Sequence, residues 1–392
     1  MSVTTRNGMR DRMFAAFALV ATTLLCFAFG RALLTVNDER IVVALLVTLA
    51  AGIVLAERRV TRAPDSALVR GAVSTAPAAV LLAIVALILV FHANHFALLL
   101  ICTLLIYVTV ALGLHLQFGY AGVLNFAGAA FFGIGCYTAA VLTQLAWLPH
   151  PVVMVLGGVF AALIGLALLP PVLRTRGHYA SVVTIAFGVL FTTFLEINET
   201  FGGAQGMHVA GLSLFGFDMT RNIRLSPGVT LSFYFGYAVV ALLLAVGAFA
   251  LVTRIERSWI GLTLDAVRLD ETRSACFGID LARWKIFAFC LGNFIIGVAG
   301  ALFGMLMSFI APPNFSFSAS LMLVAIIILG GIGNRWGVLL GATLIVLVPE
   351  RLQTIQEYRV LLFAALIVGL LLIRPNGLAP RRMRRYFGEG SA

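Results

Sequence analysis

The residues of this sequence that could do chemistry are few and scattered. Its 16 Asp and Glu residues lie in loops or at the ends of apolar segments, where Glu196 and Glu350 come closest to an apolar run. A transporter driven by protons or cations usually places an ionisable group near the middle of the membrane. The pattern therefore argues against such a transporter, although coupling ions held by backbone carbonyl groups would leave no such mark.

A nucleotide site is not expected, because Lys285 is the only lysine in the chain. The phosphate-binding loop of an ATPase needs a lysine and a hydroxyl after its glycines. The glycine-rich stretch from Leu329 to Gly337 has neither at that place, so we predict a tight turn there. If ATP drives this protein, ATP and Mg²⁺ are bound by partner chains, and this chain holds no cofactor of its own.

Metal ligands and catalytic sets are also missing from the pattern. The six histidines show no zinc spacing, and we predict them at membrane interfaces. No spacing indicates a serine, histidine and acid arrangement. The five cysteines are predicted to be small packing residues and not disulfide or metal partners. We therefore predict no catalytic residue and no metal site, which argues against an enzyme.

The composition indicates the fold class, since the 392 residues are 61% hydrophobic and only 11% charged. Apolar runs that could cross about 30 Å of hydrocarbon recur along the chain. We predict an all-α polytopic membrane protein with about 10 to 12 transmembrane helices, some of them broken or re-entrant. The apolar segments cover about residues 13–36, 40–56, 76–92, 95–117, 119–143, 151–173, 180–197, 229–253, 284–310, 319–332, 336–349 and 359–373.

The net charge of +11 reports the orientation of the chain in the membrane. With the N-terminus in the cytoplasm, 21 of the 27 Lys and Arg residues fall in stretches on the inner side. The positive-inside rule therefore predicts that both ends lie inside. Because these cations lie between the apolar runs and form no single basic face, lipid is expected as a partner and nucleic acid is not.

The first apolar run continues to Val36 without a signal-cleavage pattern, which favours a retained first helix.

One apolar stretch, GYAGVLNFAGAAFFGIG from Gly119 to Gly135, does not suit a plain spanning helix. It contains five glycines and Asn125, and a bilayer penalises every unpaired polar group. We predict that it enters from the cytoplasmic side, breaks near Asn125 to Gly128 and continues as a helix. Asn125 would pair with freed backbone groups, meet a solute or tie two helices together. The candidate residues of a broken helix or translocation path are Gly122, Asn125, Phe126, Gly128, Phe131 and Phe132.

Small residues recur four apart in other apolar runs, as in Gly157, Ala161 and Gly165 or Gly300 and Gly304. This spacing puts each set on one helix face, where neighbouring backbones can approach closely. We predict tight helix packing at these positions.

The stretch from Arg254 to Lys285 is the long hydrophilic segment on the predicted inner side. Apolar residues alternate with charge at helical spacing, Asp270 can cap a second short helix, and Gly278 can end it. Such a helix either lies flat on the membrane or docks in a partner's groove. The pattern alone leaves both open.

This stretch resembles the ATPase-coupling loop of the branched-chain amino acid ABC importer permeases. The family pattern, of the type RSRIGRALRAIRxDExAAxxLGI, departs here at Trp259, Leu262 and Asp265, where basic residues are common. The residues that match it in order are Arg257, Ser258, Ile260, Gly261, Leu264, Ala266, Arg268, Asp270, Glu271, Ala275, Gly278 and Ile279.

Other motifs carry the same resemblance over about residues 97–375. GVLNFAGAAFFGIGCYTAA is similar to the broken-helix segment of the family, and RTRGHYASVVTIAFG, IAPPNFSF and LGGIGNRWGVLLGA are similar to three further motifs. Phe201 stands where the family usually has the threonine of T-G-G. The resemblance is to the M-type permease, which pairs with an H-type sister.

The resemblance implies a permease subunit in a bacterial inner membrane that carries a small polar solute, such as a branched-chain or other amino acid. The implied partners are the sister permease, two ATP-binding-cassette ATPase subunits and a periplasmic solute-binding protein. Arg268, Asp270 and Glu271 would make polar contacts in the ATPase groove. Leu264 and Phe277 would fill that groove, while Gly261 and Gly278 would shape the loop.

The chain divides into an N-terminal helix pair with an Arg-rich cytoplasmic loop at residues 1–75, a permease core at 76–375 with the coupling loop 254–285, and a basic cytoplasmic tail at 376–392. Two other functions remain as alternatives. One is a facilitator or channel for a neutral solute such as urea or an amide, without an ATPase. The other is a scaffold or assembly subunit without a solute path.

Overall fold

The computed structural model describes residues 3–35, 67–144, 148–174, 179–214, 217–219, 222–226, 229–351, 364, 368–369, 372 and 377–379. Long helices dominate these residues, so the predicted all-α class is confirmed. Six helices are long and apolar enough to cross a membrane: His95–Ala121, His150–Arg174, Tyr179–Ile197, Tyr234–Arg257, Leu281–Met307 and Pro312–Gly330. Shorter apolar helices accompany them, as expected for a polytopic protein with broken segments.

The longer helices lie within or overlap the predicted apolar runs, although α1 and α3 begin about ten residues earlier and α5 begins about nine residues later than predicted. Their bounds are α1 Val3–Thr35, α3 Ala67–Val90, α4 His95–His115, α5 Gly128–Thr143, α6 His150–Arg174, α7 Tyr179–Ile197, α8 Tyr234–Arg257, α9 Trp259–Leu269, α10 Glu271–Cys276, α11 Leu281–Met307, α12 Phe317–Gly330 and α13 Arg335–Arg351. A π-helical segment, η1, covers Leu116–Ala121. The predicted segments at 40–56 and 359–373 lie outside the described residues, apart from a few isolated positions in the second.

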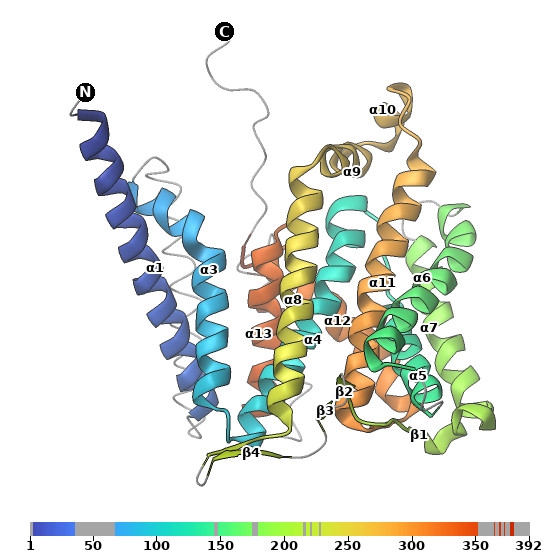
Figure 1. Ribbon diagram of the computed structural model, residues 1–392. Helices are drawn as coiled ribbons and strands as arrows, with labels where there is room; N and C mark the ends of the chain where they lie inside the picture. The colour runs from blue at the N-terminus through green and yellow to red at the C-terminus, as the bar shows by residue number, and fades with distance from the viewer. Residues whose placement is uncertain are drawn as a thin grey trace.

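Figure 1 shows the orientation of the bundle. The starts of α1 and α3 lie at the same end as α9 and α10, and the short strands lie at the opposite end. The segment 254–285, which runs from the last turn of α8 to the first turns of α11 and carries six of the cations assigned to the inside, is therefore at the end where the chain begins. This arrangement agrees with a cytoplasmic N-terminus. Of the predicted basic tail, only residues 377–379 are described.

Short elements cover the outer end. They are η2 Glu199–Phe201, η3 Gly203–Gln205, η4 Pro312–Phe315, β1 Met207–His208, β2 Ser213–Leu214, β3 Phe217–Asp218, β4 Ile223–Ser226, β5 Val229–Leu231 and β6 Phe309–Ile310. The antiparallel pair of β1 and β6 joins the loop after α7 to the end of α11. Tyr237 of α8 adds a second tie, because its hydroxyl accepts from Leu212 N at 2.7 Å and donates to Met305 O at 3.1 Å. The outer loops are thus attached to the core helices.

Helix α11 lies at the centre of the core and packs against α4, α5 and α6. Glycines allow this close approach, because a Cβ at Gly135 of α5 or Gly300 of α11 would run into a backbone carbonyl of the other helix. A Cβ at Gly157 of α6 would lie 3.3 Å from the Gly297 carbonyl oxygen of α11. The small residues predicted from their spacing to serve helix packing do so.

The N-terminal helices form one edge of the molecule. Helix α3 packs mainly against α1, and the two stand side by side away from the centre in Figure 1. The predicted boundary at residue 76 falls inside α3, which begins at Ala67. The division of the chain into 1–75, 76–375 and 376–392 stays a prediction.

Candidate functional site

A helix break lies inside the bundle, after α4. The helix passes into the π-helical segment η1, which is buried throughout, and Gly122 ends it with φ of 68°. Glycine suits this position because a left-handed backbone strains other residues. The chain then runs without regular structure to Ala127, and α5 begins at Gly128. The break therefore starts slightly earlier than the sequence predicts, and the sequence analysis missed the π-helix.

Three backbone N–H groups around the break are bound by side-chain oxygens. Phe126 N donates to Thr184 Oγ1 of α7 at 3.0 Å. Ala127 N donates to Asn125 Oδ1 at 2.9 Å. Ala129 N donates to Ser320 Oγ of α12 at 3.1 Å. Because an unpaired N–H group is costly at membrane depth, these three oxygens allow a non-helical segment inside the bundle.

Three buried amides meet beside the break, and we refer to Gln117, Asn125 and Asn293 as the amide cluster. Asn125 Nδ2 donates to Gln117 Oε1 at 2.7 Å and to Asn293 Oδ1 at 3.3 Å. Gln117 Nε2 donates to Asn293 Oδ1 at 2.9 Å and to Phe289 O at 3.3 Å. All three residues are fully buried. The cluster joins η1, the break and α11 by hydrogen bonds.

Asn293 differs from the other two amides because its Nδ2 has no hydrogen-bond partner among the described residues. This nitrogen lies against Gly165 of α6, where a Cβ would clash with it. The buried polar side chains of the described part include no Asp, Glu, Lys or Arg. The cluster can therefore donate and accept hydrogen bonds, but it offers no fixed charge.

Two aromatic residues of the predicted path lie in the core, and Phe131 is the one close to this cluster, through Phe289. Phe131 stacks on Phe187 with ring centroids 5.3 Å apart and meets Phe289 edge-on at 5.9 Å. Phe132 packs on Phe303 at 5.1 Å. Both phenylalanines are buried. In this conformation they fill space and do not line an open passage.

The remaining residues predicted for the path lie around the break. Phe126 meets Phe118 of η1 edge-on at 5.9 Å. A Cβ at Gly128 would lie 2.9 Å from Leu114 Cδ1, so the start of α5 lies close against α4. The structure thus places Gly122, Asn125, Phe126, Gly128, Phe131 and Phe132 in one region. Whether a solute touches them stays a prediction.

The cytoplasmic segment forms two short helices with the predicted ends. Asp270 caps α10, since its Oδ1 accepts from Arg273 N at 3.0 Å. Gly278 follows α10 with φ of 77°, as expected for a glycine after a helix. Helix α9 packs against α8 and η1, so it contacts the chain where the break begins.

The inner face of α9 corrects one prediction. Gly261, Leu264 and Val267 are buried within this chain, so Leu264 cannot fill a groove on an ATPase as predicted. Its spacing indicated an apolar face, but packing against the chain's own helices uses that face. The outer side of α9 instead exposes Trp259, Leu262 and Leu269 by 68%, 47% and 82%, and Phe277 after α10 is 85% exposed. We refer to these four residues as the cytoplasmic apolar patch.

Arg268 turns inward and makes a contact inside the chain, while its predicted contact with an ATPase stays a prediction. Its Nη1 donates to the carbonyl oxygen of Gly119 in η1 at 2.5 Å. A Cβ at Gly122 would lie 3.4 Å from Arg268 Cγ, which places the arginine stem against the end of η1. Because Gln117 lies two residues before Gly119, one hydrogen bond and two residues of backbone separate α9 from the amide cluster.

The two acidic residues of the segment have partners within the chain. Asp270 pairs with Arg273 at 2.9 Å, in addition to its role as a cap. Glu271 pairs with Lys285 of α11 at 2.7 Å and fastens α10 to that helix. The Glu271 side chain is still 58% exposed. Contact of either carboxylate with an ATPase stays a prediction.

Several residues of the site were missed by the sequence analysis. Gln117 and Asn293 could have been found as amides in apolar runs, by the argument applied to Asn125. Thr184 and Ser320 gave no such signal, since a hydroxyl inside a helix usually bonds to its own backbone. His115 corrects the prediction of histidines at membrane interfaces, because it is fully buried and meets Tyr120 edge-on at 5.4 Å.

Comparisons with known proteins agree with the motifs. Residues 96–371 match the family model described as branched-chain amino acid transport system / permease component. Over 289 residues the chain is 34% identical to the high-affinity branched-chain amino acid transport system permease protein LivM of Escherichia coli (strain K12), and the match covers 70% of this chain and 68% of that protein. The LivM protein of Salmonella typhimurium matches with the same identity and coverage.

More distant relatives bear the name of the other permease type. The permease protein LivH of Escherichia coli (strain K12) is 24% identical over 290 residues, and the match covers 70% of this chain and 91% of that protein. No solved structure was found to match the chain.

Proposed function

The chain belongs to the family of branched-chain amino acid transport permease components, and on this premise we propose that it moves an amino acid through its core when an ATPase pulls on the segment 254–285. It is a multi-pass membrane protein and a permease subunit of an ABC importer. The observation that carries the proposal is the hydrogen bond from Arg268 of α9 to Gly119 of η1.

The coupling works through a short chain of contacts. A movement of α9 is transmitted to η1 through the Arg268 hydrogen bond and through the packing of α9 against η1. From η1 it reaches Asn125 and Asn293 through Gln117. Because broken helices can bend at the break with little loss of hydrogen bonding, this region is suited to have two arrangements that an ATPase biases differently.

The path lies beside the amide cluster and the phenylalanines of α5. Phe131 and Phe132 are packed against other rings, so they must move when a solute passes. The amides offer donors and acceptors to an ammonium or a carboxylate group, and the rings suit an apolar side chain. Without a buried counter-charge among the described residues, a zwitterion would be held weakly and released quickly. An amino acid with an apolar side chain fits these properties, and the relatives are named for such substrates.

The exposed surface of the segment 254–285 supports the proposed contact with an ATPase. The cytoplasmic apolar patch is exposed at the end of the molecule where α9 and α10 lie, and it would enter a groove on an ATP-binding-cassette subunit. ATP and Mg²⁺ would be bound there and not on this chain. A sister permease of the H type, a second ATPase subunit and a periplasmic solute-binding protein would complete the importer in a bacterial inner membrane.

Reconstitution tests the proposal. The complex purified through this chain is placed in liposomes with leucine-loaded binding protein outside and ATP inside, and radiolabelled leucine uptake is measured. We expect uptake that needs ATP and stops when the phosphate-binding lysine of the ATPase is replaced. Leucine flux through this chain alone, independent of ATP, would show a facilitator instead. A complex that assembles but carries no amino acid tested would reject the proposed substrate class.

A further inference from the structure

A groove separates the N-terminal helices from the core, and the proposed function does not use it. Helices α3, α4, α8 and α13 enclose a volume of about 800 Å³, which is in the range of ligand and cofactor sites. Its walls are mostly aliphatic, with Leu81, Leu105, Val246 and Leu339 among them. Helix α3 packs mainly on α1, so its other face borders the groove. No residue of the amide cluster or the cytoplasmic apolar patch lines it.

The cytoplasmic end of the groove carries positive charge. Arg254 and Arg257 line it in the last turn of α8, three residues apart and hence on one face of the helix. Both are exposed, and neither forms an ion pair with another described residue. Arg335 also lines the groove, but it pairs with Glu256 and lies 5.5 Å from the ring centroid of Phe249. Two cations are therefore left for a ligand.

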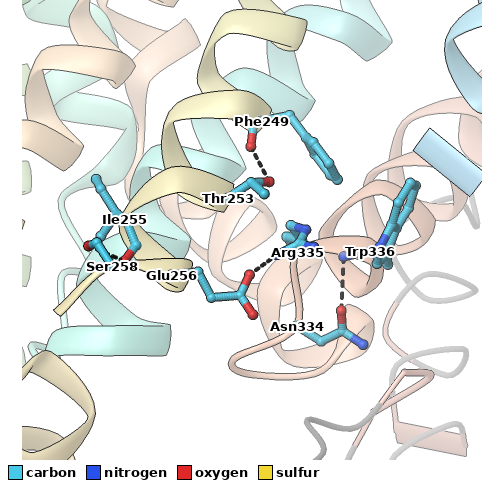
Figure 2. A network of polar contacts seen from close by, with 8 residues as sticks. All are labelled: Phe249, Thr253, Ile255, Glu256, Ser258, Asn334, Arg335 and Trp336. Carbon is cyan, nitrogen blue, oxygen red and sulfur yellow. Dashed lines mark hydrogen bonds and ion pairs between the residues drawn. The ribbon is translucent and has the colours of Figure 1, made fainter. Parts of the chain in front are cut away.

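The other polar groups at this end are already used, as Figure 2 shows. Thr253 Oγ1 donates to Phe249 O at 2.6 Å, and Ser258 Oγ donates to Ile255 O at 2.7 Å. The two hydroxyls can still accept, but the charged groups left at this end are guanidinium groups, which donate and do not accept. A suitable ligand therefore presents negatively charged acceptors, and phosphate geometry matches guanidinium well. No carboxylate is among the described residues that line the groove, and Glu256 beside it is paired with Arg335.

The depth of the groove points to a lipid. From Leu242 to Arg254, α8 extends about 18 Å at 1.5 Å per residue, close to half of a hydrocarbon core of roughly 30 Å. Trp336 stands at the charged end and packs edge-on against Phe249 at 5.0 Å. Tryptophan is typical of the level of lipid headgroups. The groove thus has an apolar part as deep as one leaflet and a basic part at the headgroup level.

We propose that this groove binds an anionic phospholipid of the cytoplasmic leaflet, with its acyl chains between α3 and α8 and its phosphate on Arg254 and Arg257. The charge of the mouth and the depth of the apolar walls select this occupant over a soluble metabolite. Arg257 directly precedes Ser258, the residue before α9. The bound headgroup would therefore hold the start of the segment that carries Arg268.

The test measures lipid bound to the intact purified complex by native mass spectrometry, with phosphatidylglycerol and phosphatidylcholine of the same acyl chains as probes. Each cation near an anionic headgroup changes the affinity roughly fivefold. We expect Arg254→Gln and Arg257→Gln each to weaken phosphatidylglycerol binding by about that factor. The matched control is Arg174→Gln, which removes an exposed arginine in the last turn of α6 and outside the groove.

A second variant separates the two parts of the site. Ala250 is exposed and lines the groove, so Ala250→Trp should fill the space, keep the fold and displace the lipid without changing the charge. Equal binding of the two lipids, or equal effects of Arg174→Gln and Arg254→Gln, would overturn the proposal of a specific anionic site. No bound lipid, together with no effect of Ala250→Trp, would also overturn it, because another part of the chain would then occupy the groove.

Discussion

Replacing Arg268 by glutamine removes the charged donor that joins α9 to η1. A hydrogen bond with one charged partner contributes about 1.5 to 3 kcal/mol, and the lower half of that range applies because Arg268 is only partly buried. At 1.36 kcal/mol per factor of ten, about 1.5 to 2 kcal/mol corresponds to a roughly 10- to 30-fold shift toward states in which α9 no longer moves with η1. Coupling free energies between distant sites are of this size.

The assay measures ATP hydrolysis and leucine uptake by the same reconstituted complex. Since the contact lies inside this chain, Arg268→Gln should leave the ATPase subunits bound and lower the leucine carried per ATP hydrolysed by about tenfold. Arg273→Gln is the matched control. It removes an arginine with an 83% exposed side chain from the same segment, and its i,i+3 ion pair contributes only about 0.3 to 0.5 kcal/mol.

Two results would refute this reasoning. If Arg268→Gln releases the ATPase subunits, the arginine contacts the partner and its bond to Gly119 is secondary. If both uptake and hydrolysis stay at the level of the Arg273→Gln control, α9 and η1 move together without this hydrogen bond. Arg268→Lys keeps a charge but loses the planar fork, so it should restore part of the coupling at most.

Three further substitutions test the packing and the polar contacts. Gln117→Leu removes both hydrogen bonds between η1 and the other amides. It should lower the free energy of unfolding by about 1 to 2 kcal/mol in a denaturant titration and reduce leucine uptake. Full stability and uptake would show that the amide cluster has no role. Gly135→Ala places a methyl group against a carbonyl of α11 and should lower the free energy of unfolding by about 1 to 3 kcal/mol in the same titration. Gly247→Ala is the control, because a Cβ there meets nothing within 4 Å and should leave the free energy of unfolding unchanged. Equal stability of the two variants would contradict the close helix approach. Gly261→Ala puts a Cβ 2.6 Å from a backbone oxygen at the end of α8, whereas Gly278→Ala adds only the strain of a positive φ, about 1 kcal/mol. Gly261→Ala should therefore impair leucine uptake far more than Gly278→Ala. The reverse order would show that the turn after α10 matters more than the start of α9.

Local features of the chain were predictable because they depend on neighbours in sequence. Apolar runs predicted the helices, since a bilayer requires each spanning segment to bond its own backbone. Asp270 and Gly278 predicted the ends of α10, because a cap needs only a side chain or a backbone conformation at one position. The glycines and Asn125 likewise predicted a break after α4.

The choice of partners could not be predicted in this way. The spacing that gives α9 an apolar face does not say whether that face meets the same chain or another one, and Leu264 was assigned to the wrong side for this reason. The buried Asn125 could have met backbone, solute or another helix. In the structure it bonds to Gln117, Asn293 and the Ala127 backbone.

The sequence by itself determined the class of the protein, the approximate positions of most described helices and the presence of a break after α4, and it predicts the orientation in the membrane. Only the tertiary structure decided that Gln117 meets Asn293, 176 residues away, and that Arg268 reaches Gly119, 149 residues away. The physical reason is the range of the interactions. Hydrophobicity and capping act over a few residues, whereas a buried donor binds whichever acceptor the packed helices bring within about 3 Å.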